Sequence, residues 1–354
     1  MARRLTLLCP SFERHRYLKR SMRFWSDRDD VCVLYADGSL SQLDSSSVNS
    51  SNITYMHRPG GGYRERLLWL IDQVETPYVC ILSDDEFYLP SALKLCVDFL
   101  DKHPDYVSCM GRAIGFSSLN GKIILRQQYP RLRGKNLSDA DALNRLHNHF
   151  SCYVPSHFYA VTRTEVFRNA IKAALAVELD VYAIFELSTE LLVLAAGKST
   201  VLPALYWLRS FEVPPLRNTG DIALNPSKTF AHWWQSKDFE MQRSDFCKYL
   251  SLSSLCTLQE HDIWQAFDYY IHSQNQLVTL NDCSLSHRLR QIPLALVKRY
   301  LLMPLVRTIN LFKKFIRPAA HNKVALQDLR CQGVSIDEFC FAECLSSIEE
   351  SWRN

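Results

Sequence analysis

The sequence predicts an α/β fold in which helices cover both faces of a mostly parallel central sheet. Four short apolar runs with strand-forming residues occupy positions 5–9, 31–36, 53–56 and 78–83. The segments between them carry turn signals or apolar residues at three- and four-residue spacing, so strands and helices alternate. Such β-α-β units build parallel sheets, and near-continuous apolar strands indicate burial on both faces. An apolar fraction of 47% in 354 residues supplies the core that this fold requires.

The helices of the first half follow from the spacing of their apolar residues. RYLKRSMRFW (16–25) and YRERLLWLIDQV (63–74) each place apolar residues along one side of a helix. Pro90 begins a third helix, which ends before the turn at 103–105.

From about Tyr106 the pattern changes to antiparallel strands. The apolar runs 106–116 and 123–129 flank Asn120-Gly121, a dipeptide that is typical of two-residue hairpin turns. The later expected elements are a helix from Thr164 to Ala176, a helix at 181–196 ended by Gly197, and strands at 199–202 and 205–210.

A change in composition around Pro214 predicts a domain boundary. Residues 1–213 form the α/β domain in this interpretation. Residues 214–354 form a mainly helical region that is rich in Trp, Tyr and Phe.

Composition and charge exclude several classes of protein. The net charge of +4 is too small for a general nucleic-acid binder, so no nucleic-acid partner is expected. The twelve cysteines are scattered through apolar patterns, which favours a reducing compartment. The apolar run near the start is too short for a signal peptide, and no run reaches the eighteen residues of a membrane-spanning helix. We therefore expect a cytoplasmic protein, with peripheral membrane contact left open.

Three acids follow directly after a predicted strand in YVCILSDDEFYLP (78–90), namely Asp84, Asp85 and Glu86. Adjacent carboxylates repel each other, and burying unpaired charge is costly. A divalent cation such as Mg²⁺ or Mn²⁺ compensates such a group, whereas the alternative is a solvated acidic turn. Ligands of parallel sheets bind at the carboxyl ends of the strands, and this position favours a functional site.

Several segments together resemble a known family. They are PSFERHRYLKRSMRFW, VLYADGS, TPYVCILSDDEF (Thr76 to Phe87), Gly111-Arg112 and FELSTELLVLAAG. Their order and spacing are similar to those of bacterial glycosyltransferases of the family 2 type, in the branch with a TPYV…DDDF signature. The resemblance covers about the first 210 residues and implies a GT-A fold that binds a nucleoside-diphosphate sugar.

The resemblance implies a metal site and a donor site. Asp84, Asp85 and Glu86 occupy the DxD position, where carboxylates hold Mn²⁺ or Mg²⁺ against the donor diphosphate, although the third acid here is Glu instead of Asp. The positions matching nucleotide-sugar contacts are Pro10, Ser11, Arg14, Asp37, Arg64, Arg66 and Asp84. Alternatively, Asp37 is an ordinary turn residue before Gly38, and the two helix arginines are solvated charges.

The general base departs from the family pattern. Inverting relatives carry Glu-Asp on a helix shortly before a glycine, and the second acid deprotonates the acceptor hydroxyl. Counting back from Gly197 places Glu186 on the first acid but Leu187 on the second. Glu186, or Glu190 one turn later, is therefore the predicted base, because an acid among apolar residues has a raised pKa. The alternative is that each only caps or pairs locally.

The resemblance implies the transfer of a single sugar to an acceptor hydroxyl, with inversion, in surface polysaccharide or glycoconjugate assembly. The Q-x-x-R-W stretch and the membrane helices of processive synthases are absent from the sequence. The acceptor would be a glycan or a lipid-linked molecule. The rival hypothesis, motivated by Leu187, is a non-catalytic module that binds nucleotide sugars or glycans.

Segment 288–323 contains nine Lys or Arg residues and no acid, with apolar residues at helical spacing. This combination predicts a helix on an anionic membrane surface, at the inner face of the cytoplasmic membrane. The alternative is a helix that packs on the core and exposes a basic side.

Overall fold

The computed structural model describes residues 3–44, 50–181, 183–212, 228–282 and 318–353. Its ten-stranded sheet has the strand order β3-β2-β1-β4-β9-β6-β10-β5, with β7 beside β6 and β8 beside β10. The strands are β1 (Leu5–Ser11), β2 (Val31–Asp37), β3 (Ile53–His57), β4 (Tyr78–Ile81), β5 (Phe87–Tyr88), β6 (Tyr106–Leu119), β7 (Lys122–Gln128), β8 (Asn136–Leu137), β9 (Val161–Arg163) and β10 (Lys198–Ser210). The helices of the first 200 residues are α1 (His15–Ser26), α2 (Tyr63–Asp72), α3 (Pro90–Lys102), α4 (Ala142–Ser151), α5 (Thr164–Ala176) and α6 (Ile184–Ala196).

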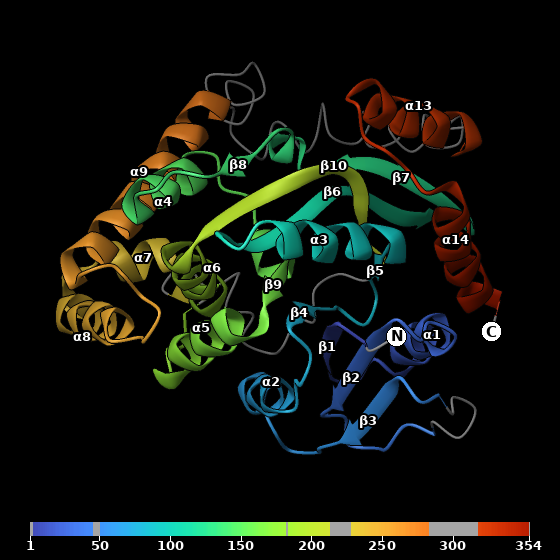
Figure 1. Cartoon of the computed structure of the whole chain (residues 1–354), viewed down its shortest axis with the longest axis horizontal. Coiled ribbons are helices and arrows are strands. Elements are labelled where there is room, and N and C mark those ends of the chain that lie inside the picture. The colour runs from blue at the N-terminus through green and yellow to red at the C-terminus, as the bar shows by residue number, and fades with distance from the viewer. Residues whose placement is uncertain (1–2, 45–49, 182, 213–227, 283–317, 354) are drawn as a thin grey trace, which may run out of the picture.

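The first part of the sheet is parallel, as the sequence predicts. β1 pairs with β2 and with β4, and β2 pairs with β3, all in parallel register. α1 joins β1 to β2, and α2 joins β3 to β4. All four strands end at the same edge, so the residues that follow β1, β2 and β4 lie near one another (Figure 1).

The second part of the sheet is mixed. β9 is antiparallel to both β4 and β6, whereas β6 and β10 are parallel to each other. The predicted hairpin at Asn120-Gly121 joins β6 and β7, and both turn residues have positive φ. The two strands expected at 199–202 and 205–210 form the single strand β10, whose register shifts between Val201 and Leu205. Pro203 lies at this shift and has no N–H to donate to a neighbouring strand.

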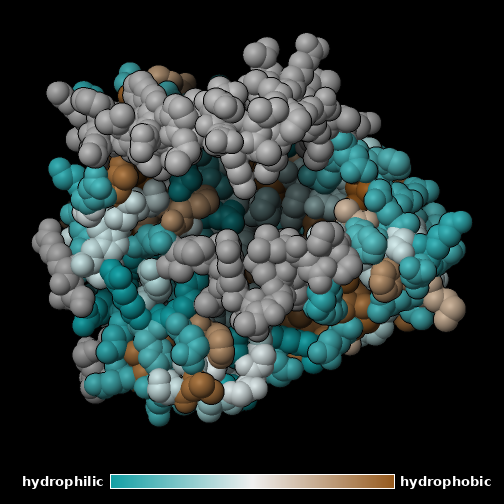
Figure 2. All heavy atoms as spheres, turned by 180° about the vertical axis from the view of Figure 1, so that it is seen from behind, coloured by the Kyte–Doolittle hydropathy of each residue, from teal (hydrophilic) through white to brown (hydrophobic). Residues whose placement is uncertain are grey.

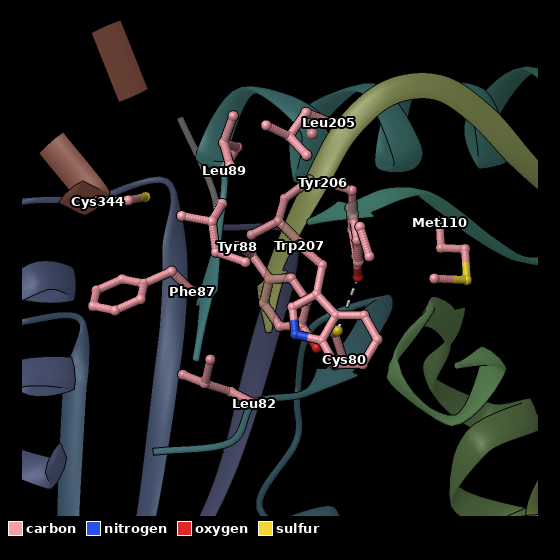
Figure 3. Packing of buried hydrophobic residues seen from close by; sticks show 14 of the residues in the cluster. Cys80, Leu82, Phe87, Tyr88, Leu89, Met110, Leu205, Tyr206, Trp207 and Cys344 are labelled. Carbon is pink, nitrogen blue, oxygen red and sulfur yellow. Dashed lines mark hydrogen bonds between the residues drawn. The ribbon is translucent and has the colours of Figure 1, made fainter. Parts of the chain in front are cut away.

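Helices cover both faces of the sheet, because side chains alternate along each strand. Along β1, Leu7 and Cys9 face a cluster that includes residues of α1 and α3, whereas Leu8 faces residues of α2, α5 and α6. Figure 3 shows the centre of the first cluster, where Tyr88, Tyr206 and Trp207 gather around Cys80.

The described residues beyond 228 are helical, as predicted, and divide between the two faces. α7 (Phe230–Gln235), α8 (Glu240–Ser251) and α9 (Glu260–Asp282) contribute to the cluster that contains α4 and α6. α13 (Pro318–Cys331) and α14 (Glu338–Arg353) contribute to the opposite cluster, and the end of α14 lies beside α1 (Figure 1). The boundary expected near Pro214 lies outside the described residues and stays a prediction.

The predicted membrane-surface segment 288–323 also lies mostly outside the described residues, which resume at Pro318. No helix in the described part of the chain is long and apolar enough to cross a membrane. Figure 2 shows the face opposite to that of Figure 1. The described side chains there are mainly hydrophilic with apolar ones interspersed, and the surface is hollowed near its centre.

Candidate active site

A cavity of about 780 Å³ opens at the carboxyl edge of β1, β2 and β4. This volume lies within the range of pockets that bind small molecules. The residues that line it are Pro10, Ser11, Phe12, Arg14, Gly38, Leu40, Gly60, Gly61, Gly62, Tyr63, Arg66, Ile81, Leu82, Ser83, Asp84, Tyr159, Phe185 and Glu186. The cavity therefore brings together six of the residues predicted from the sequence: Pro10, Ser11, Arg14, Arg66, Asp84 and Glu186.

Arg14 holds the first two acids. Its Nε lies 3.2 Å from Oδ1 of Asp84, and its Nη2 lies 2.5 Å from Oδ2 of Asp85. The Ser11 hydroxyl donates to Asp84 Oδ2 at 2.6 Å. Burial raises the pKa of Asp84 to about 7, and the positive charge of Arg14 opposes this rise. Asp84 and Asp85 are thus buried, and the Arg14 guanidinium contacts both of their carboxylates.

Glu86 does not line the cavity. Its Oε2 accepts a hydrogen bond from Trp207 Nε1 at 2.8 Å, and Arg209 lies 3.9 Å from its other oxygen. Burial, together with the charge of Asp85, raises the pKa of Glu86 to about 8. The structure therefore places the third acid of the expected metal site against the indole, and not with Asp84.

The donor set is consistent with a hard divalent cation only in part. Among the described residues, no three His, Cys, Asp or Glu side chains converge as metal ligands. Asp84 nevertheless lines the cavity, and Asp85, which does not line it, contacts the same Arg14 guanidinium. Mg²⁺ commonly takes one or two carboxylates together with substrate phosphates. Asp84 and Asp85 would therefore suit a divalent cation whose remaining ligands include phosphate oxygens of the donor.

Asp37 lies beneath the cavity wall and is fully buried. Its Oδ1 accepts from the amide and the hydroxyl of Ser39, at 3.0 and 2.5 Å, and its Oδ2 accepts from the Tyr55 hydroxyl at 2.9 Å. His15 Nε2 lies 3.2 Å from Oδ2. Asp37 therefore fixes the loop that begins at Gly38, and it does not itself line the cavity.

The two helix arginines have different positions. Arg66 is buried, lines the cavity, and donates to the carbonyl of Gly61. Its Nε has no partner in the described part of the chain, and burial lowers its pKa. Arg64 instead donates to the carbonyl of Leu175 at 2.6 Å, near the end of α5, and does not line the cavity. The prediction that both arginines face the donor thus agrees with the position of Arg66 alone.

Glu186 and Glu190 lie one turn apart on α6 but face different surroundings. Glu186 lines the cavity, and burial together with the charge of Glu190 raises its pKa to about 7. Glu190 is only 1% exposed, and its oxygens bind His149 Nε2 and the amide of Phe158, both at 2.8 Å. Leu187, at the position of the family aspartate, is buried in the core. Of the two predicted bases, only Glu186 reaches the cavity.

Comparison with known proteins supports the resemblance. Residues 17–169 match the family model described as glycosyl transferase family 2. Residues 17–169 thus resemble a family 2 glycosyltransferase domain. The matched range extends from α1 into α5 and includes all three acids after β4. No curated protein sequence matches the chain significantly.

Solved structures share the fold of this glycosyltransferase. S. aureus TarS residues 1–349 has a TM-score of 0.50 and 15% identity, and the match covers 99% of this chain and 91% of that one. The same fragment in complex with UDP-GlcNAc has a TM-score of 0.51 and 14% identity, with the same coverage. A longer TarS chain matches with a TM-score of 0.50 and 15% identity; the match covers 77% of this chain and 43% of the longer one. This similarity confirms the predicted GT-A fold.

The sequence analysis missed several parts of the glycosyltransferase site. Tyr159 and Phe185 line the cavity, and Trp207 holds Glu86. Arg20 donates to the carbonyl of Asp85 at 2.8 Å and pairs with Glu212 at 2.7 Å. Arg20 and Phe185 lie within the segments that carry the resemblance but were not assigned to the site, and no local pattern marks Tyr159 or Trp207.

Proposed function

We propose that the protein is a metal-dependent, inverting glycosyltransferase that moves one sugar from a nucleoside-diphosphate donor to an acceptor hydroxyl. The observation that carries this proposal is the position of Glu186, which lines the same cavity as Asp84 and has a pKa near neutrality. The acceptor oxygen forms a bond to the anomeric carbon as the bond from that carbon to the diphosphate breaks. Glu186 takes the acceptor proton, and the nucleoside diphosphate leaves.

Glu186 is the proposed general base. A base works best when its pKa lies near the working pH, and burial raises the pKa of Glu186 to about 7. Glu190 is already bound by His149 and by the Phe158 amide, so it is not free to receive the acceptor proton. This arrangement also argues against the non-catalytic alternative, since the loss of the second acid at Leu187 leaves an acid in the cavity.

Asp84 and Asp85 would hold Mn²⁺ or Mg²⁺. A bound cation stabilises the negative charge that develops on the leaving diphosphate. On the other side of the cavity, Arg66 and the N-terminus of α2, which begins after Gly62, offer positive charge to the same group. Arg14 contacts both carboxylates and keeps them near each other, with Asp84 lining the cavity.

The first donor to test is a UDP-sugar, because a structural neighbour was crystallised with UDP-GlcNAc. We place the reaction in surface polysaccharide or glycoconjugate assembly in a bacterium, with a glycan or lipid-linked acceptor. These assignments come from the family resemblance. The expected location is the cytoplasm, with peripheral contact at the inner face of the membrane.

A donor panel tests the proposal directly. Calorimetry with UDP-, GDP- and dTDP-sugars in the presence of Mn²⁺ is paired with an assay of sugar transfer or donor hydrolysis. We expect binding of one nucleotide class and metal-dependent turnover, which Asp84→Ala/Asp85→Ala abolishes. Binding without turnover for any acceptor would favour the non-catalytic module, and full activity of the double variant would overturn the site.

The membrane contact has a separate test. The basic segment should bring the full-length protein onto anionic liposomes at low salt, where each nearby Lys or Arg contributes about 1 kcal/mol. Flotation should require anionic lipid, decrease at high salt, and decrease when Lys313, Lys314 and Arg317 are changed to Glu. Protein that stays in the soluble fraction under all conditions would support the alternative of a helix that packs on the core.

A further inference from the structure

A chain of buried polar groups lies behind α6, outside the proposed mechanism. Glu190 Oε2 lies 2.8 Å from His149 Nε2. On the far side of the imidazole, Lys135 Nζ lies 3.4 Å from His149 Nδ1 and donates to the His149 carbonyl at 3.2 Å. The imidazole thus donates from Nε2 and accepts at Nδ1, which defines a neutral tautomer. Burial, with the charge of Lys135, lowers the pKa of His149 and agrees with this assignment.

The other oxygen of Glu190 holds a short turn. Oε1 accepts the Phe158 amide at 2.8 Å, at the start of the 3-10 turn His157–Tyr159. Ser156 precedes this turn but makes no side-chain capping bond to it. Glu190 therefore supplies from α6 the cap that the local sequence does not provide.

The turn places Tyr159 in the wall of the active-site cavity. The Tyr159 ring stacks on Trp207, with ring centroids 4.9 Å apart and planes 27° apart. The Trp207 indole in turn donates to Glu86 at 2.8 Å. Figure 3 shows Trp207 in the buried cluster beside Tyr88 and Cys80. A continuous set of contacts thus leads from Glu190 to the acids after β4.

We propose that Glu190 is a positioning residue. Bound by His149, whose imidazole contacts Lys135 on its other side, it fixes the turn His157–Tyr159 and thereby holds Tyr159 against Trp207, between the helix that carries Glu186 and the acidic segment. The predicted effect of Glu190 on kcat rests on the proposed sugar-transfer reaction. The contacts between Glu190, Tyr159 and Trp207 do not depend on that reaction.

Glu190→Gln tests the contact chain with little change in volume. Gln can still accept from the Phe158 amide, but its NH₂ group faces His149 Nε2. The imidazole must then move its proton to Nδ1, where it meets the Lys135 ammonium. We expect the turn to shift, and a misplacement of this kind lowers kcat by about 10²-fold while the donor KM stays near the wild-type value.

Two measurements separate positioning from a loss of stability alone. The first is the split between kcat and donor KM, with Glu165→Gln, an exposed acid on α5, as the matched control. The second is the ¹H–¹⁵N resonance of the Trp207 indole, assigned by its loss in Trp207→Phe. Glu190→Gln should move this resonance and Glu165→Gln should not. Glu190→Asp keeps a carboxyl group on a shorter side chain and should recover part of kcat.

A wild-type kcat and an unmoved indole resonance in folded Glu190→Gln would overturn the proposal. If that variant does not fold, Tyr159→Leu replaces it, because it leaves the Glu190 contacts intact and removes the ring. Tyr159→Leu should lower kcat and move the Trp207 resonance, and wild-type behaviour of both would contradict the proposal. If the wild-type protein transfers no sugar, the proposed function fails, while the indole resonance still decides whether Glu190 positions Tyr159.

Discussion

Two acidic segments border the active-site cavity, one after β4 and one on α6, and their carboxyl groups have different partners. After β4, Asp84 and Asp85 are buried against Arg14, which contacts both carboxylates. On α6, Glu186 lines the cavity with no hydrogen bond or ion pair to another described residue, and Glu190 is held by an amide and a neutral imidazole. Burial raises the pKa of both Asp84 and Glu186, but only Asp84 lies beside a guanidinium whose positive charge opposes the rise.

This difference indicates two kinds of chemistry. Burial raises the pKa of Asp84 to about 7 despite the charge of Arg14, and a bound divalent cation would favour the charged form that a ligand needs. A carboxyl group whose pKa is raised by burial, such as that of Glu186, exchanges its proton near neutral pH, as a general base must do. The same residue type thus has two proposed roles, and the surroundings decide which role each residue has.

The largest expected effect comes from the acids after β4. Asp84→Asn removes the charge that would face the metal and the diphosphate, and we expect kcat/KM to decrease about 10³-fold. Glu86→Gln should have a much smaller effect, because Glu86 faces Trp207 and a Gln oxygen can still accept from that indole. Steady-state kinetics of both variants, with the partly exposed Asp98→Asn as the control, measures the contrast. Equal losses for Asp84→Asn and Glu86→Gln would place Glu86 at the metal, as the sequence predicts.

The next effect comes from the α6 segment. Glu186→Gln removes the proposed base with little change in cavity size, and we expect kcat to decrease by about 10²-fold. The dissociation constant of the donor should change little, because the proposed role of Glu186 is to take the proton of the acceptor hydroxyl and not to bind the donor. Single-turnover transfer and calorimetry measure the two quantities, with Glu165→Gln as the control. A large loss of donor affinity with unchanged kcat would assign Glu186 to donor binding.

Activity and stability should change in opposite directions with pH. The base acts when deprotonated, so kcat/KM should rise as pH passes about 7, the pKa of Glu186. The folded-state pKa values of Glu186 and Glu190, about 7 and about 8, lie above the ordinary 4.5. Folding therefore takes up protons, and this contribution to stability is present at low pH and is lost between about pH 4.5 and 8.

Thermal unfolding at pH 5 and pH 8 tests the second half of this prediction. The midpoint should be lower at pH 8, and Glu190→Gln should flatten the dependence because it removes one titrating group. Asp84 and Glu86, whose pKa values are also raised by burial, add to the same trend. A midpoint that rises from pH 5 to pH 8 would show that the α6 acids are ionised throughout.

The fold was largely predictable, because its signals are local and periodic. The four strands of the parallel part, α1 to α3 and the Asn120-Gly121 hairpin all appear where apolar spacing and turn residues place them. The antiparallel position of β9 between β4 and β6 was not predictable from the pattern of Val161–Arg163. A strand of three residues contains too little periodicity to indicate its partners.

The site was predictable where it follows a strand end. Ser11 ends β1, and Asp84 comes shortly after β4, which ends at Ile81, so the topology brings them near each other. The orientations of Glu86, Arg64 and Glu190 were not predictable, because each depends on a partner far along the chain. Trp207, the Leu175 carbonyl and His149 are those partners.

The smallest expected effect concerns the loop that Asp37 fixes. A Cβ added at Gly38 would overlap with the guanidinium of Arg66, so Gly38→Ala must displace that side chain within the cavity. Arg66 is a flexible side chain, and its displacement should weaken the contact with the donor diphosphate only partly. We expect the donor KM to rise several-fold, by about 1 kcal/mol in binding, with kcat nearly unchanged. Gly61→Ala is the matched control. A Cβ added there would lie 3.7 Å from its nearest neighbour, the Arg58 carbonyl oxygen, so the donor KM should change less than in Gly38→Ala. If both variants have the same donor KM as the wild type, the pairing of Gly38 with Arg66 does not matter for donor binding, and only the acids of the cavity remain as its determinants.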